Sequence, residues 1–291
     1  MQSLHTGQVT IVGTGLLGGS VGLALRAQGF TGTIVGVGRR EQTLEAAKQC
    51  GCIDRGTTTL AEGVADADLV ILATPVSVIL SALAEIAPVL SPEAVVTDVG
   101  STKQSIVARA EAELQHPSRF VGSHPMAGGA QTGPEAGDAD LFTGKPVIVT
   151  PTDRTDADAL EQVEGLWSDL GMRLSRMTPE AHDVAVARIS HMPHAAALML
   201  VNLAKAADLE VASTGFENMT HAALGDPNMW ADIFLDNAEA VTQVLSEWRE
   251  LWDGFEQIVR ERDRAGMLKL LQNTQQTRHN WQQQRRPNSG A

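Results

Sequence analysis

The stretch VTIVGTGLLG at residues 9–18 decides the fold of the N-terminal part of this 291-residue chain. Its first four residues are all β-branched, which predicts a strand. The segment Leu16–Gln28 that follows is predicted as a helix ending at Gly29. A glycine-rich turn that joins a strand to a helix is typical of the phosphate-binding turn of dinucleotide-binding folds. The stretch therefore predicts a nucleotide-binding domain in this part of the chain.

The residues of this turn each have a physical role in holding a cofactor. Gly13 permits the tight turn, Gly15 lets a pyrophosphate approach the backbone, and Gly18 lets the helix pack closely on the strand. The helix opens at Leu16 and Leu17, where free N–H groups and the positive end of the helix dipole attract phosphates. We predict that these five residues bind the cofactor.

The end of the second predicted strand, Thr33–Val37, indicates which nicotinamide cofactor binds. An NAD site usually places Asp or Glu about 20 residues beyond the glycines, where it accepts from the ribose 2′-hydroxyl. Here Gly38 is followed by Arg39 and Arg40, and no acid is present. A guanidinium pairs with phosphate through charge-assisted hydrogen bonds. The pattern favours the 2′-phosphate of NADP, with the alternative that one arginine only stacks on the adenine and NAD binds.

Alternating strand and helix patterns extend to about residue 150 and then give way to helices. Further strand-like runs lie at 69–73, 94–97, 120–123 and 147–150, and they are nearly continuously apolar. Such runs predict an α/β Rossmann-type parallel sheet covered on both faces. We predict a dinucleotide-binding domain over 1–177, an all-helical domain over 178–277 and a disordered Gln/Arg-rich tail over 278–291. The apolar helices favour a homodimer.

Composition excludes several other classes of protein. The net charge of −13 argues against non-specific nucleic-acid binding, because phosphate neutralisation needs surplus Lys and Arg. Cys50 and Cys52 lack the CxxC spacing of redox and zinc sites and are expected to be free thiols in a reducing compartment. The N-terminus lacks the pattern of a signal peptide, and no apolar run reaches about 18 residues. We expect a cytoplasmic protein that does not bind a membrane.

Three further loops follow strands of the predicted sheet. Thr74 and Pro75 follow the run 69–73, Ser101 lies in the loop after 94–97, and His124 follows 120–123. Ligands of open parallel sheets bind at the carboxyl ends of the strands, so all three loops belong beside the nicotinamide. A histidine there is well suited to take a proton from an alcohol as hydride leaves its carbon. A structural loop histidine is the alternative, which the convergence of the loops disfavours.

The helical part adds more histidines. His191 and His194 are three residues apart and could share a metal on one helix face, but no third ligand has suitable spacing, so we predict no metal. Pro193 predicts a local break that points a histidine into the cleft. Trp230 follows a turn at Asp226 and, from its pattern alone, is more typical of a core residue than of a ligand contact.

These motifs together resemble the prephenate/arogenate (cyclohexadienyl) dehydrogenases of tyrosine biosynthesis. The resemblance extends from residue 8 to about residue 260 and is far more specific than the glycine turn alone. It rests on GTGLLGGS at 13–20, DVGSTK at 98–103, GSHPMAG at 122–128, DLFTGKPVIVTP at 140–151, HDVAVARISHMPH at 182–194 and DPNMWADIFLDN at 226–237.

The resemblance implies a Rossmann domain, a helical dimerisation domain and an oxidative decarboxylation. Hydride leaves ring C4 of a cyclohexadienyl substrate for the nicotinamide, the ring carboxylate departs as CO2, and the ring becomes a phenol. His124 matches the family's catalytic histidine, which accepts the proton of the C4 hydroxyl, and Ser101 matches the serine that orients this hydroxyl. His194 matches a histidine at the substrate site, and Trp230 lies in a DP-x-x-W segment near the dimer cleft.

One segment departs from the family pattern Phe-x-Asp-x-Thr-Arg. The position of the Asp is Asn218 and that of the Arg, which grips a substrate carboxylate, is His221. The missing Asp removes an attraction for the ammonium of arogenate, so we predict a substrate site with His194, Asn218, His221 and Trp230 that prefers prephenate. Arogenate is the alternative substrate.

Two other functions compete with this reading. A β-hydroxyacid dehydrogenase of the 6-phosphogluconate or hydroxyisobutyrate type would need a catalytic lysine in the helical domain. Only Lys205 and Lys269 lie there, and neither is in a recognisable motif. A non-catalytic NADP-binding regulator would explain His221 but not the intact Ser101 and His124.

Overall fold

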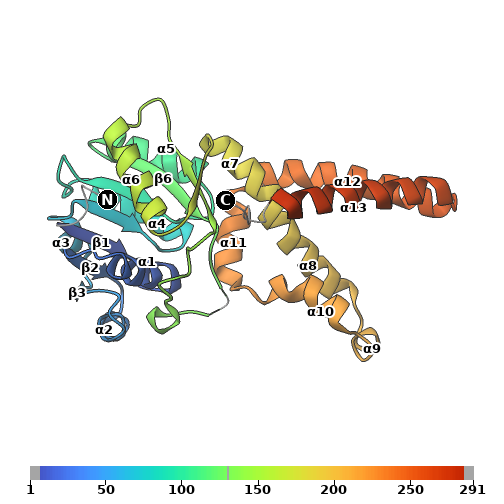
Figure 1. Ribbon diagram of the computed structural model, residues 1–291, viewed down its shortest axis with the longest axis horizontal. Coiled ribbons are helices and arrows are strands. Elements are labelled where there is room, and N and C mark those ends of the chain that lie inside the picture. Colours follow the sequence, from blue (N-terminus) through green and yellow to red (C-terminus); the bar gives the residue numbers. More distant parts are fainter. Residues whose placement is uncertain (1–6, 130, 285–291) are drawn as a thin grey trace, which may run out of the picture. The chain divides into compact units, whose positions relative to one another are not determined.

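An eight-stranded sheet organises the first structural unit (Figure 1). The computed structural model describes residues 7–129 and 131–284, and it divides into a unit that ends at Val241 and one that begins at Thr242. The strand order is β3-β2-β1-β4-β5-β6-β7-β8, whose first six strands follow the Rossmann order. The strands are β1 Gln8–Val12, β2 Thr33–Val37, β3 Arg55–Thr57, β4 Leu69–Leu72, β5 Val95–Asp98, β6 Phe120–Pro125, β7 Pro146–Thr150 and β8 Arg173–Arg176.

The sheet is mostly parallel, as predicted. Strand β8 runs parallel to β7, and β7 itself runs antiparallel to β6. It pairs with β6 so that His124 lies opposite Ile148, whereas the other strand pairs are parallel. The physical reason lies in the connection between β6 and β7. The described part of this connection holds only the short 3-10 turn η2, Pro134–Ala136, and the Met126 N–H donates to the Pro146 carbonyl at 2.9 Å. Without a crossover helix the chain returns in the opposite direction.

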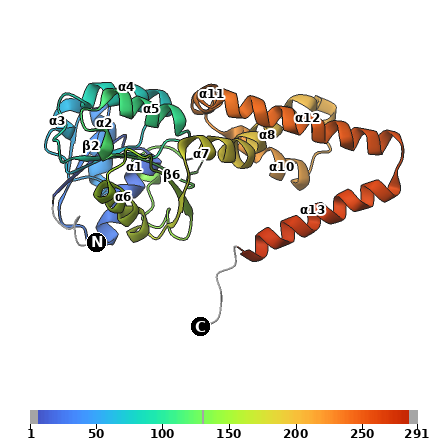
Figure 2. The same cartoon turned by 90° about the horizontal axis from the view of Figure 1, so that it is seen from above.

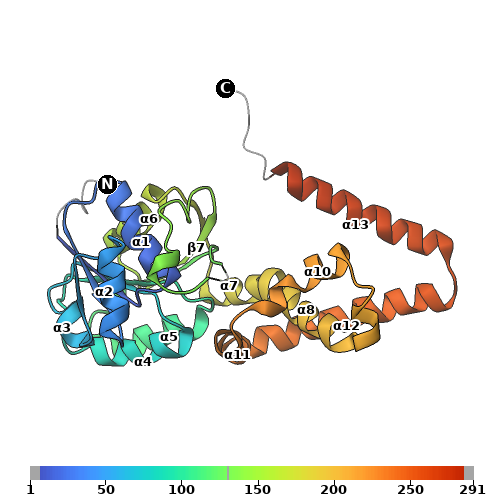
Figure 3. The ribbon, with the colours of Figure 1, turned by 90° about the horizontal axis from the view of Figure 1, so that it is seen from below.

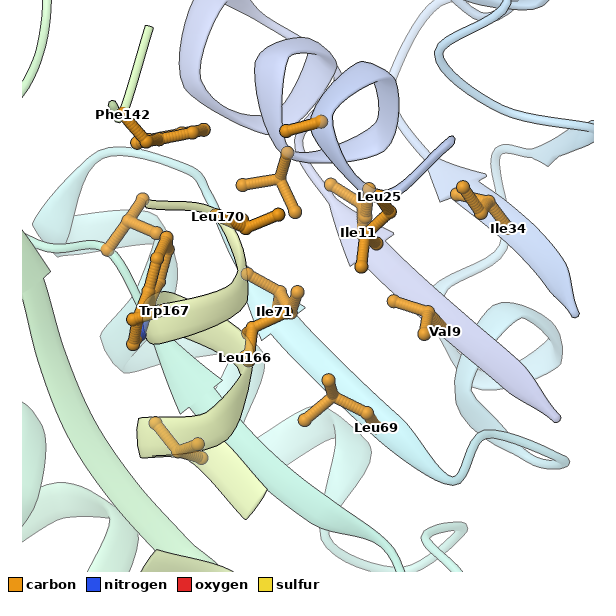
Figure 4. Packing of buried hydrophobic residues seen from close by; sticks show 14 of the residues in the cluster. Val9, Ile11, Leu25, Ile34, Leu69, Ile71, Phe142, Leu166, Trp167 and Leu170 are labelled. Atoms are coloured by element: carbon orange, nitrogen blue, oxygen red, sulfur yellow. The ribbon is translucent and has the colours of Figure 1, made fainter. Parts of the chain in front are cut away.

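Helices cover both faces of the sheet, as the continuous apolar strands predict (Figure 3). One face carries α1 Leu16–Ala27, α2 Glu41–Gln49 and α6 Ala157–Asp169, and the other carries α3 Leu60–Val64, α4 Val76–Ile86 and α5 Gln104–Glu113. Buried apolar side chains between the sheet and the first of these sets of helices form one cluster. Figure 4 shows this cluster, in which Trp167 of α6 lies near Phe142 and Ile71. Trp167 is fully buried, and its indole N–H donates to the Ser123 hydroxyl at 3.0 Å.

The two strands at the edges of the sheet, β3 and β8, escape prediction from the sequence. Their sequences are RGT and RLSR, which contain no apolar run. Each has only one neighbouring strand, so its side chains are mostly exposed and do not need to be apolar. The buried strand β2, in contrast, is predicted with the bounds that the structure shows.

The rest of the first unit is helical, as predicted. It contains α7 Pro179–Val186, the π-helical turn η3 Ala187–His191, α8 Met192–Leu203, α9 Ala206–Leu209, α10 Thr214–Thr220, the 3-10 turn η4 His221–Leu224 and α11 Pro227–Asp236. A short 3-10 turn, η1 Pro117–Arg119, precedes β6. The break expected at Pro193 takes the form of η3, because proline has no N–H and its ring excludes the carbonyl of the preceding turn.

The second unit contains most of α12 Ala238–Arg260 and all of α13 Arg264–Gln284. The chain reverses between these helices, where Arg262 adopts a φ of 54° (Figure 2). The predicted disorder from residue 278 is wrong up to Gln284, because residues 278–284 contain no Gly or Pro and continue the helix. Residues 285–291 lie outside the described part. The first compact unit contains α7 to α11 together with the sheet and does not divide between residues 177 and 178. The domain boundary predicted there therefore stays a prediction.

One helical stretch in the described residues, Pro179–Leu203, is long and apolar enough to cross a membrane by length and composition, with a mean hydropathy of 1.3. Core helices of other proteins have the same properties. This stretch also carries the buried polar side chains of His182, Asp183, His191 and His194, which hydrocarbon would penalise. Its length and composition alone therefore assign it no role in a membrane.

Two glycines in helices of the first unit give opposite expectations for replacement by alanine. A Cβ at Gly22 in α1 would lie 1.9 Å from the Cys52 carbonyl oxygen, so Gly22→Ala should lower the free energy of unfolding by about 1–3 kcal/mol. Gly165 in α6 has nothing within 4 Å of such a Cβ, so the control Gly165→Ala should raise it by about 0.5–1 kcal/mol. Urea unfolding measures both, and a Gly22→Ala protein as stable as the unmodified chain would contradict the close packing of α1.

Candidate active site

The glycine turn has the tight geometry that its sequence predicts. Gly13 follows β1 with a φ of +99°, and a Cβ there would lie 2.6 Å from the Ala73 carbonyl oxygen and 2.7 Å from the Thr74 side chain. The Gly13 N–H donates to the Val37 carbonyl at 2.8 Å. A Cβ at Gly18 would lie 1.9 Å from the Gly13 carbonyl oxygen. The turn therefore brings the carboxyl ends of β1, β2 and β4 together.

The same turn leaves an open cradle at the start of α1. Nothing lies within 4 Å of a Cβ built on Gly15, and no side chain caps the helix that begins at Leu16. The hydroxyl oxygens of Thr14 and Thr74 are buried and have no hydrogen-bond partner among the described residues. Free N–H groups at a helix N-terminus together with unpartnered hydroxyls suit a phosphate. These residues fit a nicotinamide dinucleotide.

Arg39 and Arg40 lie immediately beyond β2, at the edge where β1 and β2 pair. Both side chains are exposed, and neither is hydrogen-bonded to another described residue. Arg40 occupies the N-cap position of α2 with an extended backbone. Thr74 and Pro75 lead into α4 on the far side of β1, and Pro75 is its N-cap residue. The predicted cofactor residues of the three loops thus follow neighbouring strands of one sheet.

His124 lies near the end of β6 and is buried in a hydrogen-bonded line of side chains. Its Nδ1 is 2.8 Å from Nε2 of His182, and Nδ1 of His182 is 2.7 Å from Oδ1 of Asp183. The Asp183 carboxylate also accepts from the backbone N–H groups of Lys103 at 2.8 Å and Gln104 at 2.9 Å. The sequence predicts His124 but gives no sign that His182 is its partner. The dipeptide His182-Asp183 is visible in the sequence, but its contact with a residue 58 positions away is not.

A buried ion pair supports the loop between β5 and α5. The ammonium of Lys103 contacts Asp98, and both side chains are fully buried. Asp98 also accepts from the N–H groups of Gly100 at 2.8 Å and Ser123 at 3.2 Å. Burial raises the pKa of the Asp98 carboxyl, and the Lys103 ammonium opposes that rise. Ser101 is half-buried in this loop, whose shape the ion pair determines.

Burial lowers the pKa of the histidines around this site. The pKa of His124 lies well below its ordinary value because of burial first and of the neighbouring His182 second. Burial likewise lowers the pKa of His182 and His194, and it lowers that of His191 to about 4. A neutral imidazole can accept a proton, so at neutral pH His124 is ready to act as a base.

His194 and Trp230, predicted as substrate residues, lie against each other. Their rings stack with centroids 3.6 Å apart and an interplanar angle of 14°, and Phe234 packs beside both. Nδ1 of His194 is buried and has no partner among the described residues. A Cβ at Gly225 would lie 2.4 Å from Nε1 of Trp230. His194 and Trp230 therefore form a tightly packed aromatic surface, in which Nδ1 of His194 is the polar atom that still lacks a hydrogen-bond partner among the described residues.

The remaining two predicted substrate residues, Asn218 and His221, are exposed. Asn218 lies on α10, and His221 begins η4. Both elements pack on α8, the helix that carries His194. The structure therefore places these side chains near the surface of the helical part and not within the hydrogen-bonded line at His124.

No group of three or more His, Cys, Asp or Glu side chains that could hold a metal ion occurs in residues 7–129 and 131–284. The 2.8 Å separation between His124 Nδ1 and His182 Nε2 is that of a hydrogen bond.

Comparison with known protein families identifies two matching models. The prephenate dehydrogenase nucleotide-binding domain matches residues 21–176, and the prephenate dehydrogenase dimerization domain matches residues 178–273. Together these models span well over half of the chain.

Individual proteins are similar over most of their length. Prephenate dehydrogenase of Bacillus subtilis is 34% identical over 90% of this chain and 73% of its own length. The crystal structure of prephenate dehydrogenase from A. aeolicus in complex with hydroxyphenyl propionate and NAD+ superposes with a TM-score of 0.89 at 34% identity, covering 96% of this chain and 99% of that one. Synechocystis arogenate dehydrogenase superposes with a TM-score of 0.82 at 30% identity, covering 94% of this chain and 99% of that one.

Proposed function

We propose that this chain, which belongs to the prephenate dehydrogenase family, catalyses the oxidative decarboxylation of prephenate to 4-hydroxyphenylpyruvate and CO2 in tyrosine biosynthesis. The two family models and the similar proteins confirm the resemblance to this family that the sequence motifs show. The observation that carries the proposal is the position of His124, a buried neutral imidazole near the carboxyl end of a strand in the sheet that carries the glycine turn. A base at that edge lies where a hydroxyl would lose its proton.

The residues of the chain divide the work of this reaction. Bound nicotinamide dinucleotide supplies the hydride acceptor. His124 accepts the proton of the ring hydroxyl, and Ser101 orients that hydroxyl. His194 and Trp230 form the aromatic surface for the substrate, where the unpartnered Nδ1 of His194 can bond a polar substrate group. Loss of CO2 makes the ring aromatic, so the protein mainly needs to position the substrate and take one proton.

For the cofactor, we favour NADP over NAD. The exposed guanidiniums of Arg39 and Arg40 stand where an NAD site would have an acid, and neither has a partner among the described residues. The A. aeolicus relative was solved with NAD+, so NAD is the alternative cofactor.

For the substrate, we favour prephenate over arogenate. Asn218 stands at the position of the family's Asp and brings no negative charge for the ammonium of arogenate. His221 in place of Arg grips a carboxylate less firmly, because an imidazole cannot form the two parallel hydrogen bonds of a guanidinium. The similarity to an arogenate dehydrogenase keeps arogenate as the alternative substrate.

We further propose a cytoplasmic homodimer that forms through the helical part. Both cysteines are free thiols, as a reducing compartment requires. The match to a dimerization domain supports the dimer. Large apolar side chains on the helices also support it, because they are exposed in the single chain: Met199, Leu203, Leu235, Leu251, Trp252 and Phe255.

The first prediction tests the base. Incubation with prephenate and NADP should produce reduced nicotinamide, followed by its absorbance, and His124→Asn should lower turnover by about 10²–10⁴-fold while NADP still binds. Because burial lowers the pKa of His124, the acid limb of kcat/KM should lie below the ordinary histidine value. The exposed His116 provides the control His116→Asn, which should retain full turnover. Near-normal turnover of His124→Asn would assign the base elsewhere.

The second prediction tests the cofactor. Loss of a charge-assisted contact costs roughly 1.5–3 kcal/mol, so Arg39→Ala should weaken NADP by about tenfold or more and leave NAD nearly unchanged. Dissociation constants from nicotinamide fluorescence measure both. Arg154, an exposed arginine paired with Glu111, provides the control Arg154→Ala, which should change neither constant. Equal or better binding of NAD by the unmodified protein would refute the NADP preference.

The third prediction tests the substrate. The unmodified protein should show a higher kcat/KM for prephenate than for arogenate, and Asn218→Asp should shift the ratio towards arogenate by restoring a carboxylate for its ammonium. Asn218→Gln, which adds no charge, serves as the control. An arogenate preference in the unmodified protein, or no shift in Asn218→Asp, would show that another residue determines specificity.

A further inference from the structure

Hydrogen bonds join Asp183 to His182 and His182 to His124. Which atom donates in each of these bonds follows from the carboxylate of Asp183. Both oxygens of Asp183 face backbone N–H groups, since Oδ1 accepts from Lys103 and Oδ2 accepts from Gln104. Two N–H donors directed at its two oxygens are surroundings that suit a carboxylate, which has no hydrogen to donate. Asp183 is therefore an acceptor only.

The direction passes from the carboxylate to the first imidazole. Oδ1 of Asp183 can only accept, so Nδ1 of His182, 2.7 Å away, carries the hydrogen. Burial lowers the pKa of His182, so the ring is neutral near pH 7 and has one N–H group. Its Nε2 is then an acceptor.

The tautomer of His124 follows from that of His182. Nε2 of His182 accepts, so Nδ1 of His124, at 2.8 Å, must donate. We propose that His182 and Asp183 are positioning residues that hold the hydrogen of His124 on Nδ1, which leaves the Nε2 lone pair of His124 to accept the hydroxyl proton of the substrate. The inference deepens the proposed function and rests on it for the identity of that substrate.

The charges around the line suit a proton that arrives at His124. The hydroxyl proton moves to Nε2 of His124, which then has a hydrogen on each ring nitrogen. The groups that act on His124 are His182, Lys103 and His191. The pair of Lys103 and Asp98 has no net charge however its proton is shared, and His191 is neutral because burial lowers its pKa to about 4. The Asp183 carboxylate, hydrogen-bonded to His182, is the negative group at the other end of the line from the new imidazolium.

The tautomer can be read directly in the unmodified protein without any substrate. Two-bond proton–nitrogen correlation spectra of 15N-histidine-labelled protein at pH 7 distinguish protonated from unprotonated ring nitrogens, and His124→Asn assigns the signals of His124. We expect hydrogen on Nδ1 and a bare Nε2 in His124. Hydrogen on Nε2 of His124 would overturn the proposal. Because no prephenate is present, the outcome does not depend on whether prephenate is the substrate.

Kinetic measurements on variants then distinguish a role in positioning His124 from a role in stabilising the fold. Asp183 also binds the backbone at the start of α5, so the variants are made at His182. Glutamine can accept with its oxygen and donate with its nitrogen, so His182→Gln can keep the direction of the line, whereas His182→Leu cannot. In the Ser-His-Asp triad, loss of the correct histidine tautomer costs about 10⁴-fold in kcat.

We expect His182→Leu to lower kcat by about 10²-fold or more and to move the hydrogen of His124 off Nδ1, with an unchanged NADP dissociation constant. His182→Gln should keep kcat within about tenfold of the unmodified protein and keep the tautomer. Equal losses in both variants with the tautomer of His124 unchanged would overturn the proposal. Absence of prephenate turnover in the unmodified protein, together with the expected tautomer, would refute only the proposed substrate.

Discussion

The carboxylate of Asp183 is the contact on which the candidate active site depends. It joins α7 to the start of α5 through the backbone N–H groups of Lys103 and Gln104, and it bonds His182. The carbonyl of the same residue accepts from the side-chain amide of Asn237 at 2.9 Å, and that amide lies 3.2 Å from His191. Buried polar networks of this kind are stable only when every member is satisfied. One residue thus aligns the sheet, two helices and the histidines with one another.

The sequence predicts those parts of the fold that follow from local patterns. The buried strand β2 and the helix α1 have bounds within a residue of those predicted, because apolar runs and glycines determine them. The edge strands β3 and β8 have polar sequences and one neighbour each, so no local signal marks them. The reversal of β7 depends on a connection without a crossover helix, and the helical end of the chain up to Gln284 depends on good helix formers that composition suggested were disordered.

The candidate site shows the same division between local and distant information. Gly13 and Gly18 are predictable because the backbone turn leaves no room for a Cβ at either position, whereas Gly15 lies in open space and its role stays a prediction. His124 is predictable as the histidine beyond a strand, but the line to His182 and the burial of Lys103 against Asp98 arise only when distant segments pack. The motifs at 98–103 and 182–194 contain these residues, but their spacing along the chain carries no distance between them.

The π-helical turn η3 has a consequence for rotation about the helix that carries both His182 and His194. In an uninterrupted α-helix, side chains 12 residues apart are separated by about 120° around the axis. A π-bulge accommodates one additional residue, so the same pair behaves as if 11 residues apart and differs by only about 20°. His182 meets His124, and His194 meets Trp230. One extra residue therefore places His182 and His194 on nearly the same side of the helix, and its removal would turn one of them away from its partner.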